Sequence, residues 1–190
     1  MKGQRRLYRL LSLLFLAVLF AACSCNQAQR TAHLEAGYRF QPAEVLAAGV
    51  INIRQPVDGI YSAGQPTPEQ LEQLARAGIK HIVSLRPAAE LDWDEASYVR
   101  SLGMSYHSIP VRGAQDLSGV NASKLTGLLE QFEDEPALLH CGSGNRVGAL
   151  SAIAARQRGL SSQEAVAEGR RWGMTQLEEA VREKFEISSP

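Results

Sequence analysis

From about residue 50 onward, short apolar runs alternate with segments in which apolar residues recur every three or four positions. The apolar and β-branched runs predict strands at residues 59–65, 80–86, 104–111 and 137–141. The amphipathic segments predict helices that start near residues 68, 92, 121, 146, 161 and 175. Strands and helices in alternation indicate an α/β layer fold, in which the short apolar run 137–141 is a central buried strand.

Capping residues mark the starts of several of these helices. In a capping box, a Ser or Thr hydroxyl and a Glu or Gln three residues later satisfy each other's free backbone N–H groups. The chain contains three such pairs, which are Thr67 with Gln70, Ser161 with Glu164, and Thr175 with Glu178. Asn121 is a further candidate cap for the helix that follows it.

The first 22 residues have the pattern of a secretory signal peptide. Four basic residues within the first nine positions precede an apolar stretch from Leu10 to Phe20, and two alanines follow. These eleven residues would span only ~16 Å as a helix, against a hydrocarbon core of ~30 Å. A transmembrane helix is therefore the weaker alternative.

The sequence FAAC at 20–23 resembles the lipobox of bacterial lipoproteins, in which the cysteine is lipidated and becomes the new N-terminus. The resemblance implies an exported protein on the periplasmic side of a bacterial membrane, with the lipid as its link to that membrane. The serine after the cysteine favours the outer membrane. The alternative is ordinary signal cleavage, which would give a periplasmic or secreted protein. The implied organisation is a signal peptide at 1–22, a tether at 23–45 that begins at the lipidated Cys23, and a folded domain at 46–190.

The charge balance gives no sign of a nucleic-acid partner. The chain has 20 basic and 20 acidic residues, and removal of the signal peptide would leave a net charge near −4. No basic arm or long run of like charge is present.

Cysteine usage singles out one residue of the folded body. The chain has three cysteines, of which Cys23 and Cys25 lie near the N-terminus and Cys141 stands alone in the domain. No disulfide framework can therefore form within the domain, and a solitary thiol in an exported protein calls for another explanation.

The segment HCGSGNR at 140–146 suggests that Cys141 is reactive. It lies where a predicted strand passes into a helix, and both a helix N-terminus and a nearby arginine lower the pKa of a thiol. Gly142 and Gly144 allow the backbone to turn its N–H groups inward as an anion cradle. Arg146 adds a planar fork that suits two oxygens of a phosphate or a similar anion. The alternative is a buried structural cysteine in an ordinary turn.

The same segment resembles the signature loop of cysteine-dependent phosphatases. The wider pattern GIYSAGQPTPEQLEQLARAGIKHIVSLRPAAE at 59–90 is similar to the bacterial DUF442 group, which is related to the dual-specificity phosphatases. The resemblance implies a central, mainly parallel sheet flanked by helices and the hydrolysis of phosphomonoesters through a phosphocysteine. It further implies Cys141 as nucleophile and Arg146 as phosphate clamp. The amides of the loop, Gly142, Ser143, Gly144, Asn145 and Arg146, would bind the phosphate.

Two features depart from that family pattern and keep other functions open. Only four residues separate Cys141 from Arg146, where most such phosphatases have five, and four is also the number in the rhodanese sulfurtransferases. Val147 stands where the phosphatases have a Ser or Thr that assists the second step, although Ser143 could serve in part. The alternatives are a sulfurtransferase that carries a persulfide on Cys141 and a catalytically weak anion-binding module.

The general acid is the least defined residue of the expected site. Asp116 follows the predicted strand 104–111, which matches the place of the acid in the dual-specificity relatives. A solvent-exposed turn is the alternative role for Asp116. Rival carboxylates occur in the sequence LDWDE, namely Asp92, Asp94 and Glu95, for which charges in a first helical turn are the simpler interpretation.

The remaining candidates point to structural roles. His140 would orient the loop, both tryptophans would pack in the core, and Arg86 would either bind an anion or form a surface ion pair. The four histidines lack the spacing of a metal site, so no metal and no cofactor are expected. The identity of the phosphorylated substrate does not follow from the sequence.

Overall fold

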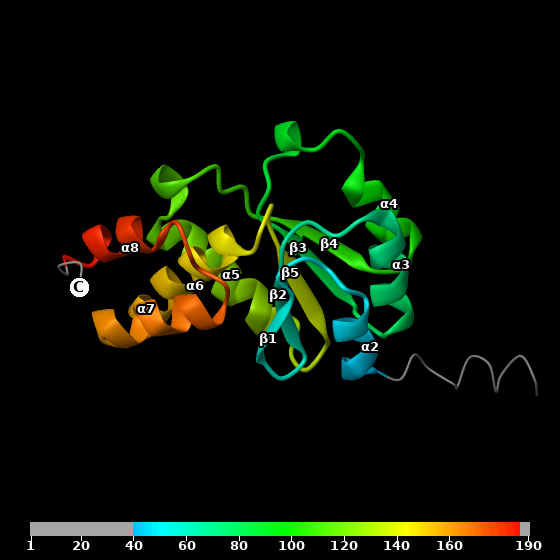
Figure 1. Ribbon diagram of the computed structural model, residues 1–190, viewed down its shortest axis with the longest axis horizontal. Coiled ribbons are helices and arrows are strands. Elements are labelled where there is room, and N and C mark those ends of the chain that lie inside the picture. The colour runs from blue at the N-terminus through cyan, green and yellow to red at the C-terminus, as the bar shows by residue number, and fades with distance from the viewer. Residues whose placement is uncertain (1–39, 187–190) are drawn as a thin grey trace, which may run out of the picture. The chain divides into compact units, whose positions relative to one another are not determined.

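The computed structural model describes residues 40–186, which form an α/β fold around one five-stranded sheet (Figure 1). The strand order is β1-β2-β5-β3-β4; β1 is antiparallel to β2, and all other neighbours are parallel. The strands are β1 Arg54–Val57, β2 Ile60–Ala63, β3 His81–Ser84, β4 Ser105–Ser108 and β5 Ala137–His140. The expected central, mainly parallel sheet is confirmed.

Helices cover both faces of the sheet, with α2, α3 and α4 on one side and α5 to α8 on the other (Figure 1). Successive residues of a strand point to opposite faces. Accordingly, Ile82 and Leu138 belong to the core on the side of α2, α3 and α4, whereas Val83 and Leu139 belong to the core on the side of α5 to α8. The helices are α2 Pro42–Ala47, α3 Pro68–Arg76, α4 Glu95–Ser101, α5 Gly119–Gln131, α6 Asn145–Gln157, α7 Ser162–Arg171 and α8 Glu178–Lys184. Two short 3₁₀ turns, Ala88–Glu90 and Ala114–Asp116, lie in loops.

The helix caps confirm part of the prediction from sequence. The capping boxes at Thr67 and Ser161 are both present. The box predicted at Thr175 is wrong, because α8 begins only at Glu178 after Leu177, without a side-chain cap. Asn121 is not a cap either, because Ser118 occupies that position and accepts the Asn121 N–H at 3.2 Å.

The folded part starts earlier than the sequence indicates. Residues 40–45, assigned to the tether, pack on the domain: Val45 in α2 is buried, and the Gln41 N–H donates to the Ala77 carbonyl at 2.9 Å. Residues 40–45 therefore belong to the folded domain. The edge strand β1 was not predicted, because it is short, contains Pro56 and buries only that one residue. The predicted signal peptide, Cys23 and Cys25 lie outside the described residues.

Helix α6 packs unusually closely against the chain segments behind it. A Cβ atom on Gly148 would lie 2.1 Å from the Met174 nitrogen and 2.5 Å from the Gly169 carbonyl oxygen. Both neighbours are backbone atoms, so they cannot move aside as a flexible side chain could. Glycine at this position therefore fixes how deeply α6 sits against α7 and the loop after it.

We expect Gly148→Ala to destabilise the fold by about 1–3 kcal/mol, because the added methyl group would force backbone segments apart. Gly127→Ala in α5 is the matched control: a Cβ there meets no atom within 4 Å, so the higher helix propensity of alanine should add about 0.5–1 kcal/mol. Urea unfolding followed by circular dichroism measures both. Equal stability of the two variants would contradict the close packing described for α6.

Candidate active site

The segment 141–146 connects the central strand β5 to α6 at the carboxyl edge of the sheet. β5 lies between the parallel strands β2 and β3, so their carboxyl ends flank this segment, called here the cysteine loop. In open α/β sheets this edge is where ligands bind. The loops 85–94 and 109–118 extend beyond the same edge (Figure 1).

Cys141 lies at the base of the cysteine loop with its sulfur turned toward the start of α6. The side chain is almost completely buried, and the Gly144 N–H donates to Sγ at 3.1 Å. Gly144 is the N-cap of α6, and its φ of +89° lies in the left-handed region that favours glycine. The sulfur therefore lies beside a helix N-terminus, whose free N–H groups carry partial positive charge.

Two carbonyl groups of the cysteine loop accept hydrogen bonds from residues outside the loop. The Gln65 N–H donates to the Gly142 carbonyl at 3.3 Å, and Asn52 Nδ2 donates to the Ser143 carbonyl at 3.0 Å. In a trans peptide the N–H points opposite to the C=O. The N–H groups of Ser143 and Gly144 therefore face away from these neighbours, and for Gly144 that direction is the one toward Cys141.

The side chain of Asn145 has a structural role that the sequence did not indicate. Its Oδ1 accepts the backbone N–H groups of Thr175 at 2.8 Å and Leu177 at 3.2 Å, and the residue is buried. The side chain thereby ties the segment between α7 and α8 to the start of α6. The sequence singled out Asn145 only as part of the amide cradle.

Arg146 is held by a carboxylate that the sequence did not identify. Its Nη1 and Nη2 donate to the two carboxylate oxygens of Glu90 at 2.9 and 2.8 Å, and Nη1 also donates to the Val111 carbonyl at 2.7 Å. The Arg146 guanidinium lowers the pKa of Glu90, as does Arg86 to a smaller extent. Glu90 ends the sequence PAAE that carried the family resemblance, but no local pattern indicates its pairing with a residue 56 positions away.

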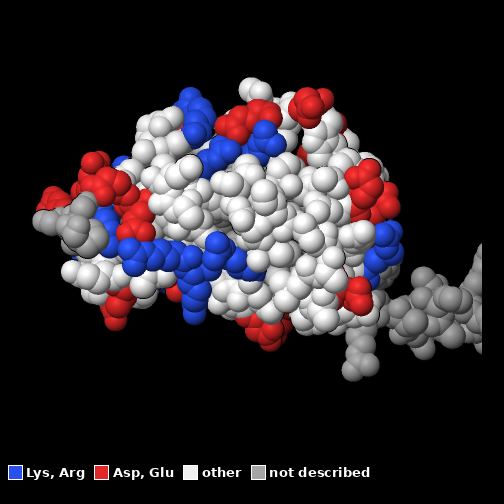
Figure 2. All heavy atoms as spheres, in the orientation of Figure 1, with Lys and Arg blue, Asp and Glu red and all other residues white. Residues whose placement is uncertain are grey.

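Arg86 joins the same cluster. Its Nη2 donates to the Glu90 carbonyl oxygen, its Nε lies 3.4 Å from the Glu90 carboxylate, and its Nη1 donates to Gln65 Oε1 at 2.8 Å. Arg86 is thus at the site, bound to a carboxylate. Basic and acidic side chains lie next to one another at this edge of the molecule (Figure 2).

Glu95 and His140 form a buried polar pair beneath the cysteine loop. Both side chains are completely buried, and His140 Nε2 lies 3.4 Å from Glu95 Oε1. Glu95 also accepts from Gln65 Nε2 and, at 3.1 Å, from the Tyr106 hydroxyl. Burial raises the pKa of Glu95, but His140 and these hydrogen bonds outweigh it, so the net pKa lies below the ordinary value. Glu95 is therefore ionised and fully engaged, which suits an anchor for His140 better than a proton donor.

The two other rival carboxylates remain at the surface. Asp94 is the N-cap of α4, where it accepts the Ser97 N–H at 3.0 Å, and Asp92 is exposed. The position of Asp94 agrees with the simpler interpretation of a charge at a helix start, whereas Asp92 lies in the bend before it.

Asp116 lies in the loop that adjoins Arg146, but Arg112 holds its carboxylate. The Arg112 N–H and Nε each donate to Oδ2 at 2.9 Å, and Nη2 donates to Oδ1 at 3.1 Å. These bonds lower the pKa of Asp116 to about 2. Asp116 is consequently ionised near neutral pH in this arrangement and can donate a proton only after its contact with Arg112 has opened.

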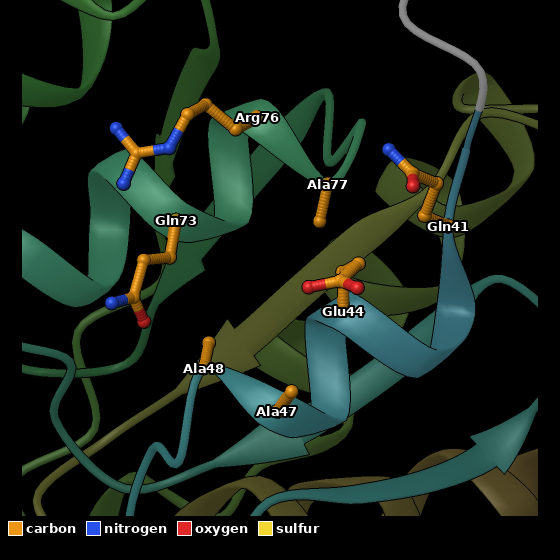
Figure 3. Close-up of a pocket in the computed structure, with 7 residues that line it drawn as sticks. All are labelled: Gln41, Glu44, Ala47, Ala48, Gln73, Arg76 and Ala77. Atoms are coloured by element: carbon orange, nitrogen blue, oxygen red, sulfur yellow. The ribbon is translucent and has the colours of Figure 1, made fainter.

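The described residues also form hollows away from the cysteine loop. A pocket between α2 and α3 is lined by small and polar residues and contains none of the site residues (Figure 3). Within residues 40–186, no group of three or more His, Cys, Asp or Glu side chains could hold a metal ion. No helix of this part of the chain is long and apolar enough to cross a membrane.

Known structures share this fold. A protein from Neisseria meningitidis Z2491, assigned as a phosphatase, superposes with a TM-score of 0.57 at 23% identity over 69% of this chain and 96% of its own. Tk-PTP in its active form superposes with a TM-score of 0.56 at 25% identity over 70% and 95% of the two chains. The catalytic core of the PP-IP phosphatase SIW14 from Saccharomyces cerevisiae gives 0.54 at 19% identity over 72% and 86%. Among curated protein sequences, none matches this chain.

A family model matches residues 60–186, which include the cysteine loop, both core layers and the α7 and α8 helices. This match covers well over half of the chain. The chain belongs to the PTP-SAK family, the Swiss Army Knife proteins with a DSP-PTPase phosphatase domain.

Proposed function

We propose that this phosphatase-family protein hydrolyses phosphomonoesters through a phosphocysteine on Cys141. The observation that carries the proposal is the Gly144 N–H bound to Cys141 Sγ at the start of α6, with the Arg146 guanidinium beside the same loop. A thiolate, an amide cradle and a fixed cation are what the attack on a phosphate group requires.

The orientation of Arg146 supports phosphate binding. Glu90 takes the edge of the guanidinium formed by Nη1 and Nη2, and Val111 takes the other hydrogen of Nη1. A guanidinium has five N–H groups, so the edge formed by Nε and Nη2 has one N–H on each nitrogen that neither Glu90 nor Val111 accepts. That edge is itself bidentate, and Nη2 lies 3.5 Å from the position of a Cβ on Gly142. Glu90 thus orients Arg146 while it leaves a fork for two phosphate oxygens.

The proposed reaction has two steps. In the first, the Cys141 thiolate attacks phosphorus, the P–O bond to the leaving group breaks, and a carboxylic acid protonates the departing oxygen. In the second, water attacks phosphorus and gives a proton to the carboxylate formed in the first step, the S–P bond breaks, and inorganic phosphate leaves with Cys141 restored as thiolate. The loop amides and Arg146 stabilise the charge on the equatorial oxygens in both steps.

We propose Asp116 as the acid of the first step. Its loop is joined to the site because Arg146 binds the carbonyl of Val111, the residue before Arg112. A bound substrate places negative charge near Arg146 and Arg112. Arg112 can then exchange its contact with Asp116 for one with the substrate, which frees Asp116 for proton transfer.

We further propose that the protein acts outside the cytoplasm as a lipoprotein anchored through Cys23. The support is the signal-peptide pattern of residues 1–22 and the lipobox-like sequence that ends at Cys23. In this location the substrate would be an extracytoplasmic phosphomonoester, and an attached lipid would bring the enzyme to the membrane surface.

We expect Cys141→Ser to abolish phosphate release from 4-nitrophenyl phosphate, because an alcohol at this position lacks the nucleophilic thiolate. The matched control is Cys25→Ser, which should retain full activity. Vanadate should inhibit the native chain, and rapid acid quenching followed by mass spectrometry should detect a phosphate adduct on Cys141. Transfer of sulfur from thiosulfate to cyanide without phosphate release would instead establish a sulfurtransferase. Phosphate binding with neither activity would indicate the anion-binding module.

Glu90→Gln should weaken phosphate binding about tenfold, because Arg146 loses the charged partner that orients it. The product inhibition constant for inorganic phosphate and the KM for 4-nitrophenyl phosphate measure this effect. Glu72→Gln, which breaks an exposed pair with Arg76 on α3, serves as control and should change neither constant. Tighter phosphate binding in Glu90→Gln would show that Glu90 competes with the substrate rather than positions Arg146.

Asp116→Asn should reduce kcat for phenyl phosphate about a hundredfold or more, because the phenolate leaves poorly without a proton. The same variant should hydrolyse 2,4-dinitrophenyl phosphate nearly as fast as the native chain, since that leaving group needs no acid. Asp92→Asn provides the control for a nearby surface carboxylate. An equal loss with both substrates would remove Asp116 as the acid.

A further inference from the structure

Four arginines lie along the carboxyl edge of the sheet, and one of them has no carboxylate partner. Arg86 and Arg146 are paired with Glu90, and Arg112 is paired with Asp116. Arg54 is exposed and forms no ion pair and no hydrogen bond through its side chain with any residue of the described part of the chain. An anion can therefore bind Arg54 without first displacing a carboxylate of the protein.

The position of Arg54 follows from the strand pairing. β1 is antiparallel to β2, so the chain enters β1 at the edge where the parallel strands end, and Arg54 pairs with Ser62 near the end of β2. Its guanidinium reaches the start of α6. Arg54 Nε and the Gly144 carbonyl oxygen each lie 3.4 Å from the point where a Cβ on Gly173 would stand.

The segment that presents Arg54 is attached directly to the cysteine loop. The Gly64 N–H donates to the Ile51 carbonyl at 2.8 Å, and Asn52 Nδ2 donates to the Ser143 carbonyl. Asn52 adopts a left-handed φ of +56°, which is unusual for a residue other than glycine and is accepted best by Asn or Asp. On the other side of Arg54, the segment after Gly173 is held to α6 by Asn145.

We propose that Arg54 forms a second anion subsite next to the cysteine loop, so that the substrate is a small molecule with at least two phosphate groups. This inference rests on the proposed phosphatase function and names its substrate class. One phosphate group binds in the cysteine loop and reacts, and another is held by Arg54 as a charge-assisted pair. Arg54 belongs to a segment tied to the cysteine loop by the Asn52–Ser143 hydrogen bond and to Gly64, after β2, by a second one, so the two subsites keep a fixed separation that selects among phosphate spacings.

Phosphonate binding tests the subsite without any need for turnover. The probes are alkane α,ω-bisphosphonates with chains of about two to eight carbons, each compared with the monophosphonate of the same chain length by titration calorimetry. When a linker matches the separation of two sites, the second contact becomes intramolecular and the affinity rises. We expect one or two chain lengths to bind the full native chain about tenfold more tightly than their monophosphonates.

Arg54→Gln should remove this bisphosphonate advantage. The matched control, Arg158→Gln, changes an exposed arginine at the opposite end of α6 and should keep the advantage. Two results would overturn the subsite. One is that no bisphosphonate binds more tightly than its monophosphonate, and the other is that the bisphosphonate advantage survives Arg54→Gln. A failure of the proposed phosphatase function can be distinguished from a failure of the subsite. A native chain that hydrolyses no phosphomonoester could still bind bisphosphonates in an Arg54-dependent manner.

Discussion

The hydrogen bond from the Gly144 N–H to the Cys141 sulfur is the contact around which the site is arranged. It requires a left-handed residue at position 144, and this residue is also the N-cap from which α6 begins. A side chain at position 144 would strain that conformation, so a single glycine sets both the direction of the helix and the donor on the cysteine sulfur. Because only four residues separate Cys141 from Arg146, the loop has little freedom to adopt another path.

The cysteine loop is rigid because other segments bind the side that faces away from the sulfur. Asn52 and Gln65 hold its carbonyl groups, and Asn145 ties the start of α6 to the segment after α7. Gly148 then allows the backbone of that segment to come into direct contact with the helix. The amide donors are therefore fixed before any anion arrives, which is the condition under which such donors contribute most to catalysis.

The sequence predicted the parts of the site that depend on neighbouring residues. Cys141, the glycines and Arg146 lie within seven positions, and their chemistry follows from the passage of a strand into a helix. The α/β alternation was likewise visible, because buried strands and amphipathic helices have different periods. Two of the three capping boxes formed where the local pattern placed them.

Residues whose role depends on distant partners were not predictable in this way. Glu90 meets Arg146 across 56 positions, and Glu95, which resembles an ordinary first-turn charge, is buried against His140. Sequence spacing cannot indicate either contact, since each joins segments that are far apart in the chain and meet at the edge of the sheet. The other misses are local. The edge strand β1 has a single buried residue and therefore no alternation, and Ser118, three positions before Asn121, is an equally suitable cap.

Arginines outnumber carboxylates at the carboxyl edge, but three of the four are paired with a carboxylate, and this pairing shapes how a phosphate could bind. Arg146 and Arg112 each keep a carboxylate, so a dianionic phosphate would enter a site that already contains Glu90 and Asp116. Binding would then be favourable where donors are not already taken by a carboxylate, which include the loop amides and the Nε–Nη2 edge of Arg146. A site of this kind discriminates by geometry more than by total charge, because a misplaced phosphate would face carboxylates at close range.

Val147 places a further constraint on the chemistry. Its side chain is completely buried among apolar residues of α5, α7 and α8, in the cluster that also contains Cys141. A hydroxyl group at this position would have to find a hydrogen-bond partner among these neighbours, at a cost that an aliphatic side chain avoids. Position 147 therefore has no hydroxyl to assist the second step of the proposed reaction. The exposed Ser143 is the hydroxyl of the cysteine loop that could take this role.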